Sequence, residues 1–244
     1  DIYQVNLTFP CHVDVGDDPA SCYGAIRKRA SAGHSALVFT GDHWLLSFSP
    51  ELFFTLENGA LVTRPMKGTA LRDTNPAHDM ASAEALRADP KQRAENLMIV
   101  DLLRNDLSRV AVSGSVEVPE LFTIESYPTV HQMTSTVTAR LNDGLDGVDA
   151  LKALFPCGSI TGAPKIRAME IIREVERYAR GPYTGTIGAI DAEGNASFNV
   201  AIRTICVEKG RTQGVIGLGS GLVADSQAES EWNECLDKAR FLGR

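Results

Sequence analysis

Apolar and polar residues alternate along several short stretches of the chain, a pattern that is typical of half-buried β-strands. Stretches 2–9 and 130–141 are examples, one near the N-terminus and one in the middle of the chain. The other predicted strands cover 36–40, 44–48, 52–56, 60–63, 110–118, 122–126, 184–191, 197–207 and 212–217. These strands fall into groups, which favours antiparallel pairing within each group.

A spacing of three and four between apolar residues predicts helices in other segments. These helices cover 19–30, 92–107, 148–155, 164–178 and a last segment that contains Lys238. Stretch 70–89 is instead polar and rich in Asp, Asn, Ala and Pro, so we expect a long mobile loop there. Groups of strands with helices inserted between them predict an α+β fold rather than a doubly wound parallel sheet.

The composition is typical of a globular protein and makes some functions improbable. The 244 residues are 43% hydrophobic and 23% charged, and no apolar run has the length of a transmembrane helix. The formal net charge of −7 argues against nucleic acid as the main ligand, because a phosphate backbone is bound by clustered Lys and Arg. The chain begins at Asp1 in a strand-like run, and we expect it to be one domain from the C-terminal region of a longer protein.

The five cysteines are odd in number and show no C-x-x-C spacing, which argues against a disulfide framework or a zinc site. Cysteines of this kind fit a reducing compartment, so we expect a cytoplasmic protein without a membrane partner. Cys157 lacks the G-x-C-x-G elbow of a glutamine-hydrolysing nucleophile and is interpreted as a small packing residue.

The C-terminal segment joins a glycine-rich strand, 217–221, to an acidic helix. That helix places Glu231, Glu234 and Lys238 on one face, because residues three and four apart are neighbours on a helical surface. Two carboxylates and an ammonium beside glycine backbone would suit a metal-bridged anion, since glycine lets a ligand come close. The alternative is a solvated surface helix with an ordinary Glu234–Lys238 pair.

Four further residues have both a functional and a structural interpretation. Lys67 lies in the Pro/Gly-bounded turn RPMKGT, where a desolvated amine is a nucleophile or a base and a solvated one is neither. Glu95, near a helix start, either ligates Mg²⁺ or complements the helix dipole. Arg203 is a lone cation in the apolar strand 197–207, and a carboxylate ligand would suit a buried guanidinium there. His131 lies in a strand-like run and is by default a core or hydrogen-bonding histidine.

Together these segments closely resemble the chorismate-utilising enzymes, a family that includes anthranilate synthase component I, aminodeoxychorismate synthase component I, isochorismate synthase and salicylate synthase. The matching runs are YQVNLT, SPELFF, RPMKGTA, AENLMIVDLLRNDLSRV, GSITGAPKIRAMEII, GPYTGTIGAID, FNVAIRTI and GSGLVADSQAESEWNECLDKAR. They span nearly the whole chain in family order. The resemblance implies two facing, largely antiparallel sheets surrounded by helices, with residues 1–244 as a chorismate-binding catalytic domain.

The resemblance implies Mg²⁺ as the cofactor and assigns its ligands. Glu95 and Glu234 would bind the metal directly and Glu231 through a water, and the metal would hold the ring carboxylate of chorismate. Lys238 would add charge near a substrate carboxylate. A dianionic substrate in an acidic protein needs a divalent metal and a buried Arg to offset its desolvation.

Other positions correspond to residues that contact the rest of the substrate. His131 matches the family histidine near the leaving hydroxyl, and Ser159 falls where the family carries Thr or Ser. Gly68 and Thr69 would line the ring. The groups implied to hold the enolpyruvyl carboxylate are Arg203, Tyr183 and the backbone N–H groups around Gly219, Ser220 and Gly221.

Two positions distinguish the branches of the family. In isochorismate and salicylate synthases a water-activating lysine stands where this chain has Gln4, which has no basic site. The residue matching Lys67 is typically alanine in those enzymes and in anthranilate synthase, whereas aminodeoxychorismate synthase carries lysine. This combination indicates amination of chorismate to 4-amino-4-deoxychorismate, for para-aminobenzoate and folate synthesis. Lys67 would be the covalent nucleophile, with a pKa well below about 10.4, and Glu51 the general acid.

The resemblance also implies a partner, because this family draws ammonia from a separate or fused glutamine amidotransferase. Two other functions remain open. One is that of anthranilate synthase component I, which adds ammonia at ring carbon 2 and eliminates pyruvate. The other is a non-catalytic fragment that binds chorismate without converting it.

Overall fold

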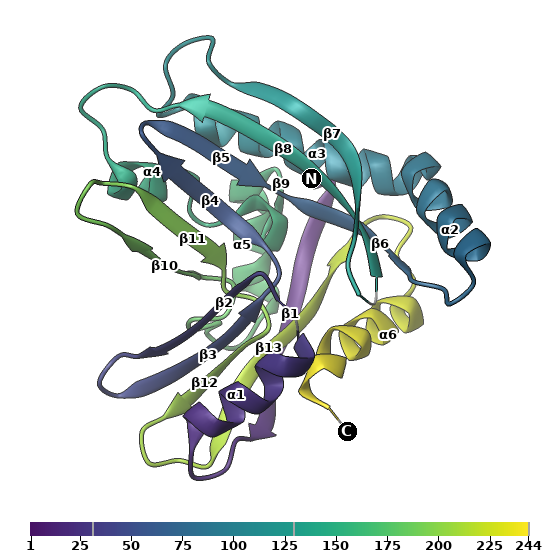
Figure 1. Cartoon of the computed structure of the whole chain (residues 1–244), viewed down its shortest axis with the longest axis vertical. Helices are drawn as coiled ribbons and strands as arrows, with labels where there is room; N and C mark the ends of the chain where they lie inside the picture. The colour runs from purple at the N-terminus through teal and green to yellow at the C-terminus, as the bar shows by residue number, and fades with distance from the viewer. Residues whose placement is uncertain (31, 129, 244) are drawn as a thin grey trace. The chain divides into compact units, whose positions relative to one another are not determined.

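The computed structural model of the chain describes residues 1–30, 32–128 and 130–243. It divides into two compact units, each assembled from segments that are distant in the sequence (Figure 1). Unit 1 comprises Asp1–Leu52, Ile160–Gly188 and Phe198–Arg244, and unit 2 comprises Phe53–Ser159 and Ala189–Ser197. No helix in the described ranges is long and apolar enough to cross a membrane.

A six-stranded antiparallel sheet forms the centre of unit 1. In order across the sheet, its strands are β2 (His34–Phe39), β3 (His43–Ser49), β12 (Thr204–Glu208), β13 (Gln213–Leu222), β1 (Gln4–Asp14) and β9 (Gly162–Ala163). The longest ladder joins β1 to β13, from Val5 opposite Leu222 to Asp14 opposite Gln213. The two ends of the chain are therefore joined in one sheet.

Three helices cover strands of this sheet: α1 (Pro19–Ala30), α5 (Lys165–Val175) and α6 (Ala228–Ala239), followed by the short 3₁₀ turn η2 (Arg240–Leu242). Helix α1 packs against β3, α5 against β1 and α6 against β13 (Figure 1). Residues at alternate positions of a strand face the same side, and the buried core uses this alternation. Its members are Val15, Ile26, Leu46, Phe48, Ile205, Val207 and Ile216.

A buried ion pair closes the edge of β1 beyond its short ladder with β9. Glu176 and Arg180 follow α5, and their side chains meet at 2.7 Å while 3% and 14% exposed. Glu176 Oε1 accepts hydrogen bonds from the backbone N–H and the hydroxyl of Thr8, both at 2.9 Å. Arg180 Nη2 donates to the carbonyl of Asn6 at 2.9 Å. The pair thus satisfies backbone groups that an edge strand would leave open.

A seven-stranded sheet belongs mainly to unit 2. Its path runs through β10 (Thr186–Ile190), β11 (Ala196–Val200), β4 (Leu52–Glu57), β5 (Ala60–Arg64), β8 (Val130–Arg140) and β6 (Met66–Leu71), and β7 (Glu117–Ser126) pairs with β8. Strand β8 forms antiparallel ladders with three partners, and its first half pairs with β6 while its second half pairs with β5.

Helices α2 (Pro76–Ala88), α3 (Pro90–Ser108) and α4 (Gly147–Leu154) belong to unit 2, and the 3₁₀ turn η1 (Gly158–Ile160) follows them. Helix α3 packs against β8 and β6 (Figure 1). Its apolar side chains recur every three or four residues, at Ile99, Val100, Leu103 and Leu107, and all four are buried. This face fixes the rotation of α3, and therefore the direction of its polar residues.

The predicted α+β fold with two antiparallel sheets and surrounding helices is confirmed. Helix α1 has the bounds that the apolar spacing predicts, Pro19–Ala30. The predicted mobile loop at 70–89 is wrong, because β6 continues to Leu71 and α2 fills Pro76–Ala88. Asn75 caps this helix with its side-chain oxygen, 2.9 Å from the N–H of Ala77, and Pro76 stands in the first turn.

Two predicted strands are also wrong. The stretch 197–207 is not one strand but the end of β11 and most of β12, which belong to different sheets. The chain changes direction at Arg203, whose φ of +50° is left-handed and ends an extended strand. In the stretch 110–118, regular strand begins only at Glu117. Apolar alternation locates extended segments but not the residue at which they bend.

We expect Asn75→Ala to lower the free energy of unfolding by about 1 kcal/mol, because the first N–H groups of α2 lose their acceptor. For a chain of this length that corresponds to about 2–4 °C in melting temperature. Asn75→Asp keeps an acceptor and should melt within about 1 °C of the unchanged protein. Equal melting of all three proteins in a circular-dichroism scan would contradict the capping role.

Candidate active site

Lys67 lies in a β-bulge of β6, not at the tip of a turn as the sequence predicts. Met66 pairs with Thr134 and Thr69 with Gln132, so three steps along β6 match two steps along β8. The extra residue falls within Lys67–Gly68, and Gly68 has a φ of +91°. A bulge redirects a side chain that a regular strand would point elsewhere. The turn prediction fails because the strand continues through the glycine.

The side-chain amide of Gln132 holds this bulge with two hydrogen bonds. Its Nε2 donates to the carbonyl of Gly68 at 2.8 Å, and its Oε1 accepts from the hydroxyl of Thr69 at 3.0 Å. A Cβ atom on Gly68 would lie 3.0 Å from Gln92 Oε1 and 3.3 Å from Leu86 Cδ1. Position 68 is therefore restricted to glycine by space and by backbone conformation.

His131 is buried in β8, with 3% of its surface exposed. Both ring nitrogens make hydrogen bonds: Nε2 lies 2.9 Å from Asp79 Oδ1, and Nδ1 lies 2.9 Å from Ser126 Oγ. The structural interpretation from the sequence, a hydrogen-bonded histidine, describes this geometry.

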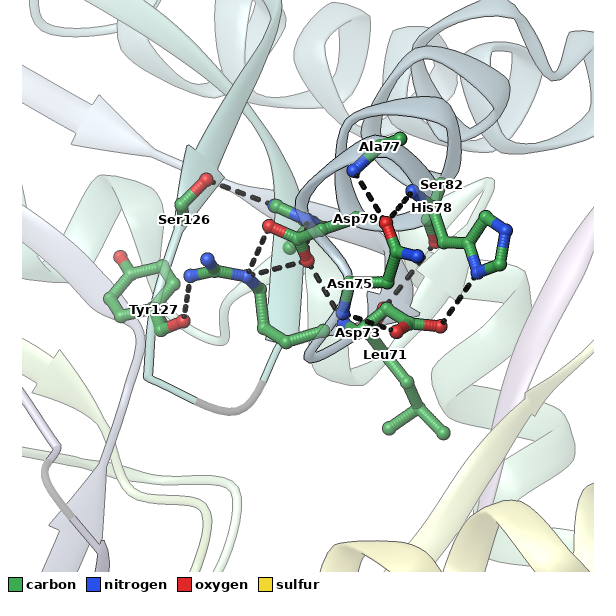
Figure 2. Close-up of polar contacts among 11 residues, drawn as sticks. Leu71, Asp73, Asn75, Ala77, His78, Asp79, Ser82, Ser126 and Tyr127 are labelled. Carbon is green, nitrogen blue, oxygen red and sulfur yellow. Dashed lines mark hydrogen bonds and ion pairs between the residues drawn. The ribbon is translucent and has the colours of Figure 1, made fainter.

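Asp79 is a candidate site residue that sequence reasoning missed, because it fell in the predicted loop. It stands on α2, and residues of the preceding turn and of the end of β7 surround it (Figure 2). An Asn-Pro pair at the start of an alanine-rich stretch is a helix-start signal, and it would have placed the aspartate in the first turn of a helix.

Arg72 fixes the charge and position of Asp79. Its Nε lies 2.8 Å and 3.0 Å from the two carboxylate oxygens, and its Nη1 donates to the carbonyl of Tyr127 at 2.9 Å. The Arg72 hydrogen bond, with the N–H of Asp73 and His131, holds the pKa of Asp79 well below its ordinary 3.8. The stabilisation from this carboxylate is therefore present above that ordinary value and is lost as the pH falls through the lower, folded-state pKa.

Two more predicted residues lie in unit 2. Glu95 is on α3 and is half-buried. Ser159 is buried in η1, with its hydroxyl 3.2 Å from the sulfur of Cys157. Cys157 is itself buried and free of disulfides, as expected of a packing residue.

In unit 1, three glycines at alternate positions of β13 each make room for another group. A Cβ atom on Gly217 would lie 2.0 Å from the ring of Tyr183. One on Gly219 would lie 2.4 Å from a carbonyl oxygen of β1, and one on Gly221 would lie 2.5 Å from Gln4 Nε2. Side chains at these positions would displace the strand or the residues packed on it. The glycines thus decide where Tyr183 and Gln4 lie.

Gln4 is 1% exposed, and neither its amide nitrogen nor its amide oxygen has a partner among the described residues. A buried polar group without a hydrogen bond costs about 1–3 kcal/mol. Native structures contain few such groups. An amide of this kind can satisfy itself on a ligand.

Arg203 and Tyr183 are also set up for a polar ligand. Arg203 is half-buried, and burial lowers its pKa. No carboxylate within the described ranges forms an ion pair with it. Burial raises the pKa of Tyr183, so this phenol stays protonated and can donate a hydrogen bond. A carboxylate bound here would offset the cost of burying the guanidinium.

The backbone of β13 offers further donors. Strand β12 pairs with β13 only from Gly214 to Ile216. Beyond Ile216, no strand of the described chain pairs with this edge of β13, toward which the backbone groups of Gly219 and Gly221 point, whereas the buried Ser220 lies opposite Leu7 and faces β1. Unpaired backbone groups on a strand edge are available to a ligand.

Glu51 lies between β3 and β4 and is 6% exposed. Its backbone is held on both sides: its N–H donates to Ser49 Oγ at 3.2 Å, and its carbonyl accepts from the N–H of Val200 at 3.1 Å. A buried carboxyl on a fixed backbone is a suitable proton donor.

Helix α6 carries the predicted acidic face. Lys238 Nζ lies 2.6 Å from Glu234 and donates to the carbonyl of Gly219 at 2.8 Å, so the Glu234–Lys238 pair of the structural interpretation is present. Glu231 Oε1 accepts from the hydroxyl of Ser226 at 2.6 Å. Its other oxygen, Oε2, is buried and has no partner in the described part of the chain.

The carboxylates of α6 meet only some of the requirements of a site for a hard cation such as Mg²⁺. No three His, Cys, Asp or Glu side chains of the described residues converge on one point. Glu231 and Glu234 belong to unit 1, whereas Glu95 belongs to unit 2. The unpartnered Oε2 of Glu231 is nevertheless the type of oxygen that Mg²⁺ accepts as a ligand or contacts through water.

Comparisons with known proteins agree with the family that the sequence resembles. A family model described as chorismate binding enzyme matches residues 1–244. Aminodeoxychorismate synthase component 1 of Salmonella typhimurium is 47% identical over 242 residues, which cover 99% of this chain and 53% of that protein. Anthranilate synthase component 1 of Methanothermobacter marburgensis is 40% identical over 242 residues, covering 99% and 52%.

A solved structure agrees as well. The crystal structure of anthranilate synthase component I from Streptococcus pneumoniae matches with a TM-score of 0.90 at 34% identity, covering 100% of this chain and 53% of that chain. The chain spans about half the length of the curated relatives it matches. From the full-length family match and these relatives, the chain belongs to the family of chorismate binding enzymes.

Proposed function

We propose that the protein converts chorismate and ammonia to 4-amino-4-deoxychorismate and water, with a glutamine amidotransferase as the ammonia source. Three relatives named aminodeoxychorismate synthase component 1 are 45–47% identical to this chain, and the word component in their name supports a partner. Relatives named anthranilate synthase are 40–42% identical. The observation that carries the choice is Lys67, a lysine placed in a bulge that redirects it.

Substrate binding follows from the charges of the site. Chorismate carries two carboxylates, and both must be neutralised if they are to leave water. We assign the enolpyruvyl carboxylate to Arg203, the phenol of Tyr183 and the open backbone edge of β13. Arg203 forms no ion pair with any of the described residues, which supports this assignment.

We assign the ring carboxylate to Mg²⁺ held by Glu95 and Glu234, with Glu231 acting through a water. The metal, when bound, would supply positive charge that neutralises this carboxylate and fixes the ring. The unpartnered oxygen of Glu231 supports the assignment. Lys238 would leave the pair with Glu234 and remain near the carboxylate.

The chemistry is two displacements at the ring. Lys67 Nζ, deprotonated, attacks ring carbon 2; both double bonds of the ring diene shift, and the C4–O bond breaks as Glu51 protonates the hydroxyl, which leaves as water. Ammonia then attacks carbon 4, both double bonds return and the C2–N bond to Lys67 breaks. The enolpyruvyl group is retained. Covalent catalysis splits one difficult substitution into two easier ones.

One further residue supports amination over hydration. Gln4 has no basic site, so it cannot activate a water for attack at carbon 2. His131 would lie near the leaving hydroxyl, and Gly68, Thr69 and Ser159 would line the ring. The product would then feed para-aminobenzoate and folate synthesis.

We expect Lys67→Ala to reduce the amination rate by about a hundredfold or more, because the nucleophile is lost. The full-length protein is incubated with chorismate, Mg²⁺ and an ammonium salt, and products are identified by chromatography and mass spectrometry. Lys67→Arg is the matched variant: it keeps the positive charge but cannot act as a nucleophile, and it should be as slow as the alanine variant.

Any result other than 4-amino-4-deoxychorismate would contradict the proposed function, and each would do so in a different way. Anthranilate from the unchanged protein would assign it to the other aminating branch. Isochorismate or salicylate would refute the interpretation of Gln4. Mg²⁺-dependent binding of chorismate without any product would favour a binding function.

We also expect Glu234→Gln and Glu231→Gln to raise the Mg²⁺ concentration for half-maximal activity by at least about tenfold, since each removes an anionic oxygen from the metal site. Glu229→Gln is the matched control, because Glu229 stands with Glu231 in the first turn of α6 but has no assigned role. A similar increase in all three variants would show a general charge effect and would argue against a metal site on α6.

A further inference from the structure

Asp79, His131 and Ser126 form one chain of hydrogen bonds within unit 2. His131 is the middle member, 2.9 Å from Asp79 through Nε2 and 2.9 Å from Ser126 through Nδ1. Ser126 and His131 are also cross-strand partners in the β7–β8 hairpin. The histidine is buried, whereas Ser126 is exposed. The chain of hydrogen bonds therefore leads from a carboxylate through a buried imidazole to the hydroxyl of an exposed serine.

The two neighbours of the imidazole differ in what they allow. A hydroxyl both donates and accepts, so Ser126 pairs equally well with Nδ1 as an acceptor or as N–H. An ionised carboxylate only accepts, so the Nε2 that faces Asp79 must carry hydrogen. Asp79 alone therefore selects the tautomer of His131, and Ser126 adapts to it.

Asp79 is itself held in place by groups outside the histidine. Arg72 contacts both of its oxygens and donates to the carbonyl of Tyr127, which joins the aspartate to the turn of the β7–β8 hairpin. The N–H of Asp73 donates to Oδ1 at 3.0 Å. Figure 2 shows Asp79 between the start of α2 and the residues Ser126 and Tyr127 of the hairpin. A carboxylate held by this many donors keeps one orientation.

We propose that Asp79 is a positioning residue for the amination reaction, which keeps His131 in the Nε2–H tautomer with Nδ1 directed at Ser126. This inference rests on the proposed function. With both nitrogens engaged, His131 exchanges a proton with a ligand only through the Ser126 hydroxyl or by giving up one of its bonds. The aspartate thereby determines that Nδ1 is the unprotonated ring nitrogen of His131, the one that faces Ser126.

The first measurement is the tautomer of His131 in the unchanged protein, from long-range ¹H–¹⁵N spectra of ¹⁵N-histidine-labelled samples above the pH at which histidine titrates. The chain has five histidines, and the His131 signal is the one that His131→Gln removes. We expect a protonated Nε2 and an unprotonated Nδ1.

Two substitutions of Asp79 then separate orientation from charge. Asp79→Ala removes the acceptor, so we expect both tautomers of His131 to appear. Asp79→Asn keeps an oxygen that can accept, so we expect the Nε2–H tautomer to persist. Asp73→Ala is the matched control, because that carboxylate lies on the same turn and accepts from the N–H of Asn75 but does not contact His131. It should leave the tautomer unchanged.

The kinetic measurement uses the same proteins. We expect Asp79→Ala to lower kcat by about tenfold or more with KM for chorismate within about twofold, in line with the contribution of a positioned proton-transfer group. Asp79→Asn should recover most of kcat, and Asp73→Ala should match the unchanged protein. Circular dichroism of each variant checks the fold, and the asparagine variant tests the proposal even where the alanine variant unfolds.

Several results would overturn the proposal. These are an Nδ1–H tautomer in the unchanged protein, a single unaltered tautomer in Asp79→Ala, and a changed tautomer with an unchanged kcat. An asparagine variant that keeps the tautomer but is as slow as alanine would show that charge, not orientation, is at work. Absence of amination by the unchanged protein would refute the proposed function instead, and the spectra would still decide whether Asp79 orients His131.

Discussion

The candidate site in unit 1 depends on how closely other groups approach the glycine backbone of β13. The ring of Tyr183, the backbone of β1 and the amide of Gln4 all occupy space that a Cβ atom on Gly217, Gly219 or Gly221 would fill. Alternate residues of a strand share a face, so one row of glycines admits all three groups on the same side. Without that row, β1 could not pair so tightly, and the tyrosine and glutamine would be displaced together.

A second regularity concerns polar groups without partners. Folded proteins satisfy nearly all buried polar atoms, because each exception costs about 1–3 kcal/mol. Among the described residues six side-chain atoms are exceptions, and three of them belong to Gln4 and Glu231. Arg203 is a further case, because its half-buried guanidinium forms no ion pair with a carboxylate of the described residues. By contrast, Glu176 and Arg180 are fully paired. Unit 1 thus pairs the charged groups that hold its strands together, and it leaves polar groups open at residues that we propose bind the ligand.

What the sequence predicts well is what depends on neighbours along the chain. The bounds of α1 and the shared face of Glu231, Glu234 and Lys238 follow from helical spacing alone. The bulge at Lys67 depends on Gln132, which binds Thr69 from 63 positions away, and the bend at Arg203 separates strands of two different sheets. Apolar periodicity carries no information about such partners. The loop predicted at 70–89 is wrong for another reason: the polarity of this stretch favours a loop, but the Asn75 cap and Pro76 start a helix there.

The bulge in β6 also bears on how such a scaffold can diversify. The bulge absorbs one extra residue, so deleting a residue within 67–68 would restore a regular ladder while Thr69 stayed opposite Gln132. A point substitution at 67 leaves that frame untouched, because Gly68 and Gln132 hold the distortion by themselves. The identity of residue 67 is thus independent of the geometry of the strand that bears it. Natural selection could exchange the functional group there without rebuilding the sheet.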